Sequence, residues 1–180
     1  MNKIATILKS HSHAEYIAQL NNPAHDINLS DYRVGNFVKI NQDYIGIIAD
    51  SEIYNPNSIT LSGQQEEFNI FAPDKINATD IYLKIIMLGR LTSQELVRET
   101  MPAGSDIELL DSNEIQIFHN NQNNSPEFQY IQILNSIDQK YAEKLLPIIY
   151  ENLQEYYSEQ ELKILKILIN NMQWQQAFAE

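Results

Sequence analysis

Short apolar runs separated by polar turns fill the first two thirds of the chain. The runs lie at residues 3–9, 14–20, 37–40, 44–54, 81–91, 106–110 and 114–118. Runs of this length, bounded by Gly, Pro, Asn and Asp, predict β-strands. Because turns join them in place of long helices, they favour a small antiparallel barrel or sandwich over a parallel α/β sheet.

Three local features indicate sharp turns within these strands. Gly35-Asn36 precedes the run at 37–40 and readily adopts positive φ. The polar triplet 41–43 separates two runs and predicts a hairpin tip. Gly46, inside the next run, indicates a bulge or a close backbone approach, as is common where a small sheet bends into a barrel.

The run 81–91 is the most apolar of the set and is predicted to be a central strand. After it, Thr92-Ser-Gln-Glu95 is a capping-box pattern that predicts a very short helix, ended by the turn residues at 100–105. The stretch 55–80, long and polar with two prolines, is interpreted as an excursion from the sheet.

The hydrophobic period changes beyond 120–127. The segment 128–137 fits either a helix or a strand, but from Asp138 the period is helical. One face of this helix collects Tyr141, Leu145, Ile148 or Ile149, Leu153 and Tyr156. Pro147 kinks this helix or marks its true start, and the capping box at 158–161 begins a second one.

An apolar stripe on the second helix is interpreted as a docking surface for a partner. Its members, spaced three, four and three apart, are Leu162, Leu165, Ile169 and Met172. Ile164, Ile167 and Leu168 widen it. Such a helical pair cannot stand alone in water, so it must pack on the barrel, on a partner, or on a second copy. A homo-oligomer is therefore left open.

Composition and charge limit the classes of partner that the protein can be expected to bind. The chain has 180 residues, 43% of them hydrophobic, no Cys and a net charge of −12. Because the chain is net negative and has no cluster of Lys and Arg, it repels the phosphate backbone, and we expect no direct binding to nucleic acid. No apolar run reaches the roughly 18 residues that span a bilayer, and the N-terminal apolar patch is too short for a signal peptide. We expect a cytoplasmic protein with no membrane contact and a protein partner.

His11 and His13 are the most suggestive candidates for metal chemistry. On a strand they would project from one face, with Glu15 continuing the alternation, and a third ligand would come from His25 or His119. The pair falls between two predicted strands, where polar turn residues are expected anyway. We therefore predict a turn and no metal ligand, and raised zinc in the purified protein would contradict this.

Catalytic motifs are absent from the sequence. It contains no phosphate-binding loop and no Gly-x-Ser-x-Gly elbow, so we predict no catalytic residue and no cofactor. Carboxylates that could in principle pair for acid–base work on glycosides are Asp50, Glu52, Asp106, Glu108, Asp111 and Glu114. In an acidic chain, most such residues form a solvated surface.

A set of turn and core markers in residues 3–118 carries a family resemblance. The markers are Val34, Gly35, Phe37 and Val38; Gly46; Leu88 and Gly89; and Pro102, Gly104 and Ser105. Their order resembles the HAS-barrel, the small N-terminal barrel of HerA-type hexameric ATPases, which is similar to the N-terminal barrel of rotary ATP synthase subunits. In the ATPases a nucleotide-binding core with a Walker loop follows the barrel. Here about 60 residues follow without that loop, so no catalytic residue is carried over.

The sequence as a whole predicts an α+β fold. A small closed or partly open antiparallel β-barrel, residues 1–119, precedes a C-terminal helical extension, residues 120–180. The resemblance implies ring formation or capping, and docking of partners onto a DNA-pumping motor. We expect a non-catalytic interaction and assembly module whose partner is a P-loop ATPase or nuclease. A metal-dependent hydrolase using His11 and His13, or a small-ligand binder at the barrel mouth with 55–80 as lid, remain as alternatives.

Overall fold

The computed structural model describes residues 3–21, 32–54, 80–121 and 125–177. The described strands are β1 (Lys3–Ser10), β2 (Glu15–Leu20), β3 (Phe37–Ile40), β4 (Tyr44–Tyr54), β5 (Asp80–Arg90) and β6 (Asp106–Leu109). The described helices are α2 (Ser112–His119), α3 (Tyr130–Ile137), α4 (Gln139–Leu153) and α5 (Lys163–Ala177). The predicted excursion at 55–80 lies, apart from its last residue, outside the described residues.

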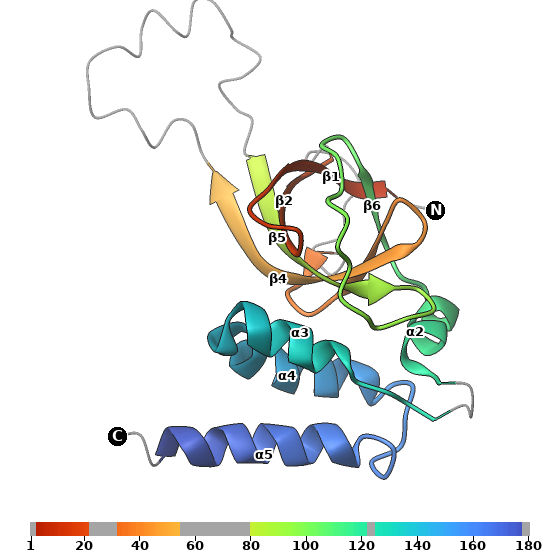
Figure 1. Cartoon of the computed structure of the whole chain (residues 1–180), viewed down its shortest axis with the longest axis vertical. Helices are drawn as coiled ribbons and strands as arrows, with labels where there is room; N and C mark the ends of the chain where they lie inside the picture. The colour runs from red at the N-terminus through yellow and green to blue at the C-terminus, as the bar shows by residue number, and fades with distance from the viewer. Residues whose placement is uncertain (1–2, 22–31, 55–79, 122–124, 178–180) are drawn as a thin grey trace, which may run out of the picture.

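The strands form a closed antiparallel barrel. Their order around it is β1-β2-β5-β4-β3-β6, and β6 pairs with β1 to close it (Figure 1). Closure pairs the first and last strands, and β2 pairs with β5, so strands distant in sequence are neighbours in the barrel. The α+β prediction, with an antiparallel barrel followed by helices, is confirmed.

Alternate side chains of the strands fill the interior of the barrel. Buried residues from all six strands and from the loop after β5 form this core, among them Ile4, Ile7, Tyr16, Val38, Ile40, Ile48, Leu83, Ile85, Met87, Met101 and Ile107. Because side chains alternate along a strand, the intervening positions of β5, such as Ile86 and Leu88, lie on the outer face. Both are fully buried there, so β5 is apolar on both faces, as its sequence indicates.

The helices cover the outer face of β4 and β5. In Figure 1, α3 and α4 lie against the barrel, and α5 lies beyond them as the outermost layer. One hydrophobic cluster joins barrel residues Phe37, Ile45, Ile47, Ala49, Ile86 and Leu88 to helical residues that include Phe118, Tyr130, Leu134, Leu145, Leu146, Ile149, Leu153, Leu162 and Leu165. This cluster crosses the predicted division between residues 119 and 120.

The predicted turns and close approaches in the β3–β4 region are present. Asn41 and Gln42, in the hairpin tip, both have positive φ. A Cβ at Gly46 would lie 2.8 Å from Ile85 Cγ2 and 3.0 Å from the Ile86 carbonyl oxygen, so only glycine fits. Gly35 has φ +91° and faces α4.

The strand predicted at 114–118 is wrong, because these residues form α2. Asp111 Oδ1 accepts a hydrogen bond from Glu114 N at 2.8 Å, and Glu114 Oε2 accepts one from Asp111 N at 3.1 Å. This reciprocal capping box satisfies two backbone donors at the helix start. The sequence Asp-Ser-Asn-Glu carried that signal.

The short helix predicted after Thr92 is also wrong. Arg90 and Ser93 bond each other's backbones in a tight turn. The Gln94 side chain donates to the carbonyls of Phe118 and Glu127, both at 2.8 Å, and accepts from Gln129 N at 2.7 Å. These tertiary bonds to the end of α2 and the start of α3 outweigh the local capping preference.

The C-terminal helices agree with the predicted helical pattern and fix where each helix begins. The ambiguous segment 128–137 contributes helix α3, and α4 follows Asp138, whose side chain caps it. Pro147 lies inside α4 and so does not mark its start, and Ile149, fully buried, lies on the core face. The capping box at 158–161 forms as predicted, with Glu161 Oε2 accepting from Ser158 N at 2.8 Å.

We expect Gly35→Ala to destabilise the protein more than Gly104→Ala. Both glycines have φ near +90°, so either alanine costs about 1–2 kcal/mol of backbone strain. A Cβ at Gly35 would lie 2.4 Å from Ile148 Cγ2, whereas at Gly104 it would meet open space. Overpacking adds about 1–3 kcal/mol at Gly35 alone. Urea unfolding measures both, and equal losses would contradict close packing of α4 on this turn.

Candidate functional site

His11 and His13 lie in the turn between β1 and β2. Ser12 Oγ accepts hydrogen bonds from Ala14 N at 3.2 Å and Glu15 N at 3.1 Å, which fixes the turn. Both histidines are exposed. The predicted turn is confirmed, and the Ser12 hydroxyl stabilises it by accepting both of these hydrogen bonds.

The structure does not bring the proposed histidine ligands together. His119 is buried at the end of α2, among the helices, and His25 lies outside the described residues. Within the part of the chain that is described, no three His, Asp or Glu side chains gather in a geometry that could hold a metal ion.

A groove of about 660 Å³ lies on the outer face of the barrel beside this turn. Its floor is a row across four neighbouring strands. Lys9 pairs with Ile17, Ile17 with Lys84, and Lys84 with Asp50. Directly opposed residues point to the same face of a sheet, so strand register assembles this row from β1, β2, β5 and β4.

A β-bulge brings Asp50 into the row. Between Ile48 and Asp50, β4 advances by two residues while β5 advances by one, from Ile85 to Lys84. Without the extra residue, Ala49 would face Lys84 and the carboxylate would lie on the opposite face. The bulge therefore gives the groove its acidic side.

Helix α4 forms one wall and holds the central lysine in place. Lys84 Nζ lies 4.5 Å from the centre of the Tyr141 ring and 2.9 Å from Glu15 Oε1. Burial alone would lower the pKa of Lys84, but the contacts with Tyr141 and Glu15 outweigh it and leave the pKa above its ordinary value. Lys144 of α4 pairs with Asp50 at 3.2 Å. Lys84, inside the row, and Asp50, at its β4 end, are thus already paired.

The basic and acidic side chains of the groove lie on different strands. Lys9 and His11 lie on the β1 side, and Asp50 and Glu52 lie on the β4 side. Leu8, Ile17, Tyr82 and Tyr141 supply apolar surface around them. The arrangement can hold a ligand by charge and by apolar contact at the same time.

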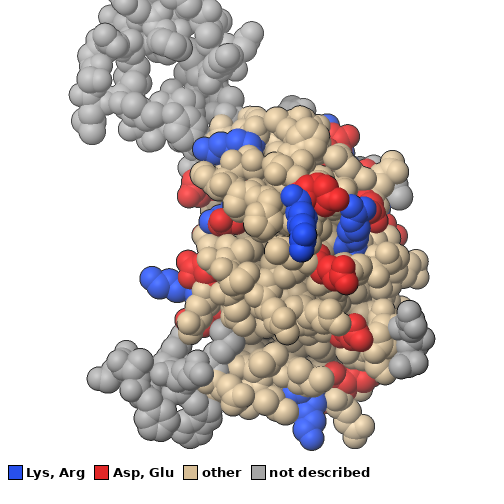
Figure 2. Space-filling model, in the orientation of Figure 1, with Lys and Arg blue, Asp and Glu red and all other residues tan. Residues whose placement is uncertain are grey.

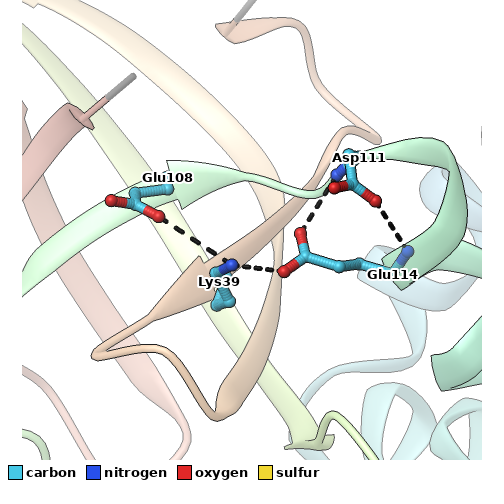
Figure 3. Close-up of polar contacts among 4 residues, drawn as sticks. All are labelled: Lys39, Glu108, Asp111 and Glu114. Atoms are coloured by element: carbon cyan, nitrogen blue, oxygen red, sulfur yellow. Dashed lines mark hydrogen bonds and ion pairs between the residues drawn. The ribbon is translucent and has the colours of Figure 1, made fainter. Parts of the chain in front are cut away.

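The other candidate carboxylates are structural. Lys39 is only 4% exposed and forms ion pairs with Glu114 and Glu108, while Glu114 also reaches back to Asp111 (Figure 3). This cluster joins β3 and β6 to the start of α2. Asp106 pairs with Lys3 at 2.6 Å. Sequence reasoning missed Lys39, whose alternation with Val38 and Ile40 on β3 places it on the outer face.

A buried histidine forms the second polar cluster. His119 Nδ1 donates to the Ile115 carbonyl at 2.8 Å, and Nε2, 3.2 Å away, accepts from the Tyr130 hydroxyl. Aromatic rings surround it, with Phe37 edge-on at 5.0 Å between ring centres. Burial lowers the pKa of His119 to about 4, so it is neutral, and it raises the pKa of Tyr130 well above its ordinary value. The histidine is therefore a neutral core residue that links α2 to α3.

The predicted docking stripe on α5 faces mainly inward. Leu162 and Leu165 are fully buried in the shared core, and Ile169 packs against it. The side chain of Met172 lies outside the described residues. Leu162 and Leu165 are therefore not available to a partner. Among the α5 side chains that the structure describes, the large exposed apolar ones are Ile164, 59% exposed, and Ile167, 48% exposed.

The described surface carries charges of both signs. On the described surface in Figure 2, acidic and basic side chains are interspersed and form no broad basic patch. None of the described helices has the length and apolar character needed to cross a lipid bilayer.

In a comparison with protein families, a family model matches residues 1–180. The chain belongs to the DUF8166 family. This family is described as a domain of unknown function. A comparison with curated proteins found no match for the DUF8166 chain. Its function therefore has to be argued from the barrel, the groove and α5.

We expect Lys39→Met to lower the free energy of unfolding by about 3 kcal/mol, because it leaves carboxylates partly buried without a cation. Lys39→Met/Glu114→Gln should recover at least about 1 kcal/mol, since glutamine removes a charge and keeps the acceptor for Asp111 N. Chemical denaturation at pH 7 measures both variants. A double variant less stable than the single one would show that the pair is not coupled.

We expect acid to destabilise the protein through His119. The unfolded chain takes up this proton near the ordinary pKa of 6.5, whereas the folded protein resists it down to about 4. The free energy of unfolding therefore falls as the pH drops from 6.5 to 4, by about 3 kcal/mol from this residue. Between pH 6.5 and pH 4, the free energy of unfolding of His119→Gln should fall by about 3 kcal/mol less than that of the parent. Equal losses in both proteins would contradict a buried neutral histidine.

Proposed function

We propose that this chain is a non-catalytic protein-interaction module that acts in cytoplasmic assembly and docks through the outer face of α5. The observation that carries the proposal is the exposure of Ile164 and Ile167 on a helix whose opposite face is fixed in the core. Residues three apart on a helix are neighbours on its surface. Exposed apolar patches of this kind are typical of interaction sites.

The charge of α5 indicates the chemistry of the partner surface. Lys163 and Lys166 are exposed next to the two isoleucines, and the sequence of α5 contains no Asp or Glu. In a chain with a net charge of −12, this helix is a local basic and apolar face. It is complementary to an apolar partner surface with an acidic rim.

The resemblance to the HAS-barrel supports a P-loop ATPase or nuclease of a HerA-type DNA-processing system as the partner. A closed six-strand antiparallel barrel is compatible with that resemblance, and Gly35 and Gly46, two of its markers, occupy positions that only glycine fits well. A small-ligand binder that uses the barrel interior has less support, because side chains fill that interior. A hydrolase built on His11 and His13 lacks a third ligand among the described residues.

The test is co-purification of the full chain with a HerA-type P-loop ATPase or the nuclease that acts with it. Ile164→Asp/Ile167→Asp should fold normally and lose at least about tenfold in affinity, because it places charge at the centre of the docking face. Ile117→Asp, at an exposed apolar position on α2, is the matched control and should bind normally. Leu165→Asp should unfold the protein, because Leu165 is fully buried.

Loss of the partner in the double variant, with normal thermal stability, would support the proposal. Retention of the partner at full affinity, or equal loss in Ile117→Asp, would overturn it. Light scattering of the chain alone shows whether a second copy occupies this face. If the parent chain forms a dimer and the double variant does not, the partner that docks on α5 is a second copy of this chain and not an ATPase or nuclease.

A further inference from the structure

The groove on the outer barrel has two charges without a described partner, one at each side. Lys9, on β1, and Glu52, on β4, are exposed, and no ion pair joins either to another described residue. Lys84, between the two sides, is paired with Glu15, and Asp50, on the same strand as Glu52, is paired with Lys144. The groove thus presents a cation on one side and a carboxylate on the other, each unpaired among the described residues, while its other lysine and its aspartate are paired with neighbouring residues.

The spacing of strands sets the distance between the two sides. The order β1-β2-β5-β4 places three strand intervals between Lys9 and Glu52, and Glu52 lies two residues further along β4 than Asp50, which shares the row of Lys9. At about 4.8 Å for each interval and about 3.3 Å for each residue, the two backbone positions are about 16 Å apart. Four residues of an extended chain span about 13 Å, and the flexible side chains of Lys9 and Glu52 reach across the remaining few ångströms. Residues i and i+4 of an extended peptide also point to the same side.

The floor between the two charges carries apolar surface beside the paired Lys84. Ile17 lies in the row beside Lys9, and Tyr82 pairs directly with Glu52 across the sheet. Residue i+2 of an extended peptide would point at this floor, midway between the two charged ends. An apolar side chain there would contact Ile17 and Tyr82.

From this geometry we propose that the groove binds an extended peptide segment of a partner protein, with an acidic residue at i, an apolar residue at i+2 and a basic residue at i+4. The acidic residue pairs with Lys9 and the basic residue with Glu52. The proposal goes beyond the docking face of α5 and depends on different residues. It explains why the bulge at Ile48–Asp50 matters, since the bulge sets which side chains of β4 face the groove.

The test uses nuclear magnetic resonance shifts of the isotope-labelled full chain with three capped peptides. Their central sequences are Asp-Ser-Leu-Ser-Lys, Asp-Ser-Leu-Ser-Asp and Lys-Ser-Leu-Ser-Lys. The first should shift the amides of β1, β5 and β4 beside the groove, with a Kd at least fivefold lower than the other two. Lys9→Glu should switch the preference to the peptide with two lysines, and Glu52→Lys to the one with two aspartates.

Lys163→Glu, on α5, is the matched control and should leave peptide binding unchanged. Equal binding of all three peptides, no groove shifts at millimolar peptide, or no switch in Lys9→Glu would overturn the proposal. Groove shifts that depend on protein concentration without peptide would mean that a second copy fills the groove, which would also overturn it. If the peptides do not bind as expected but Ile164→Asp/Ile167→Asp loses the partner, only the groove proposal is wrong. If the peptides bind as expected but the double variant keeps the partner, only the proposed function is wrong.

Discussion

The apolar outer face of β4 and β5 is the constraint on which the rest of the structure depends. Ile45, Ile47, Ile86 and Leu88 point away from the barrel interior and are still fully buried. Each such side chain would lose about 1.5–3 kcal/mol if it were exposed to water. The barrel therefore needs a cover, and α3, α4 and the inner face of α5 supply it. The buried Lys39 and His119 connect the start and the end of α2 to the same body.

The same constraint positions the groove and the outer helix. Along β5 the outward residues change from Leu88 and Ile86 to Lys84 and Tyr82 where the helical cover ends. Tyr141 of α4 marks that border, because its ring contacts Lys84. The groove is thus the uncovered part of the face that the helices cover elsewhere. Helix α5, held by Leu162 and Leu165, presents Ile164 and Ile167 outward on a fixed support.

Much of the fold is readable from the sequence because its signals are local. Strand limits, the tip at 41–43 and the need for glycine at 46 follow from alternation and turn chemistry. The two errors come from competing signals. Residues 114–118 alternate like a strand, but the capping box of Asp111 and Glu114 starts a helix there. After Thr92 no helix forms, because the Gln94 side chain bonds to the distant carbonyls of Phe118 and Glu127. The sequence also could not tell the inner from the outer face of α5, because both are apolar. The groove was missed because its row depends on strand register and on two bulges, one before Lys9 in β1 and one before Asp50 in β4.

The central claim is that barrel and helices share one core and therefore unfold together, despite the predicted division at residues 119 and 120. Native-state hydrogen exchange of the full chain, at increasing low concentrations of urea, tests it most directly. We expect the slowest amides of β4, β5 and α4 to exchange with the same free energy and the same dependence on urea. Exchange of α4 at a free energy several kcal/mol below that of β4 and β5 would show that the helices open while the barrel stays folded, and would contradict the claim.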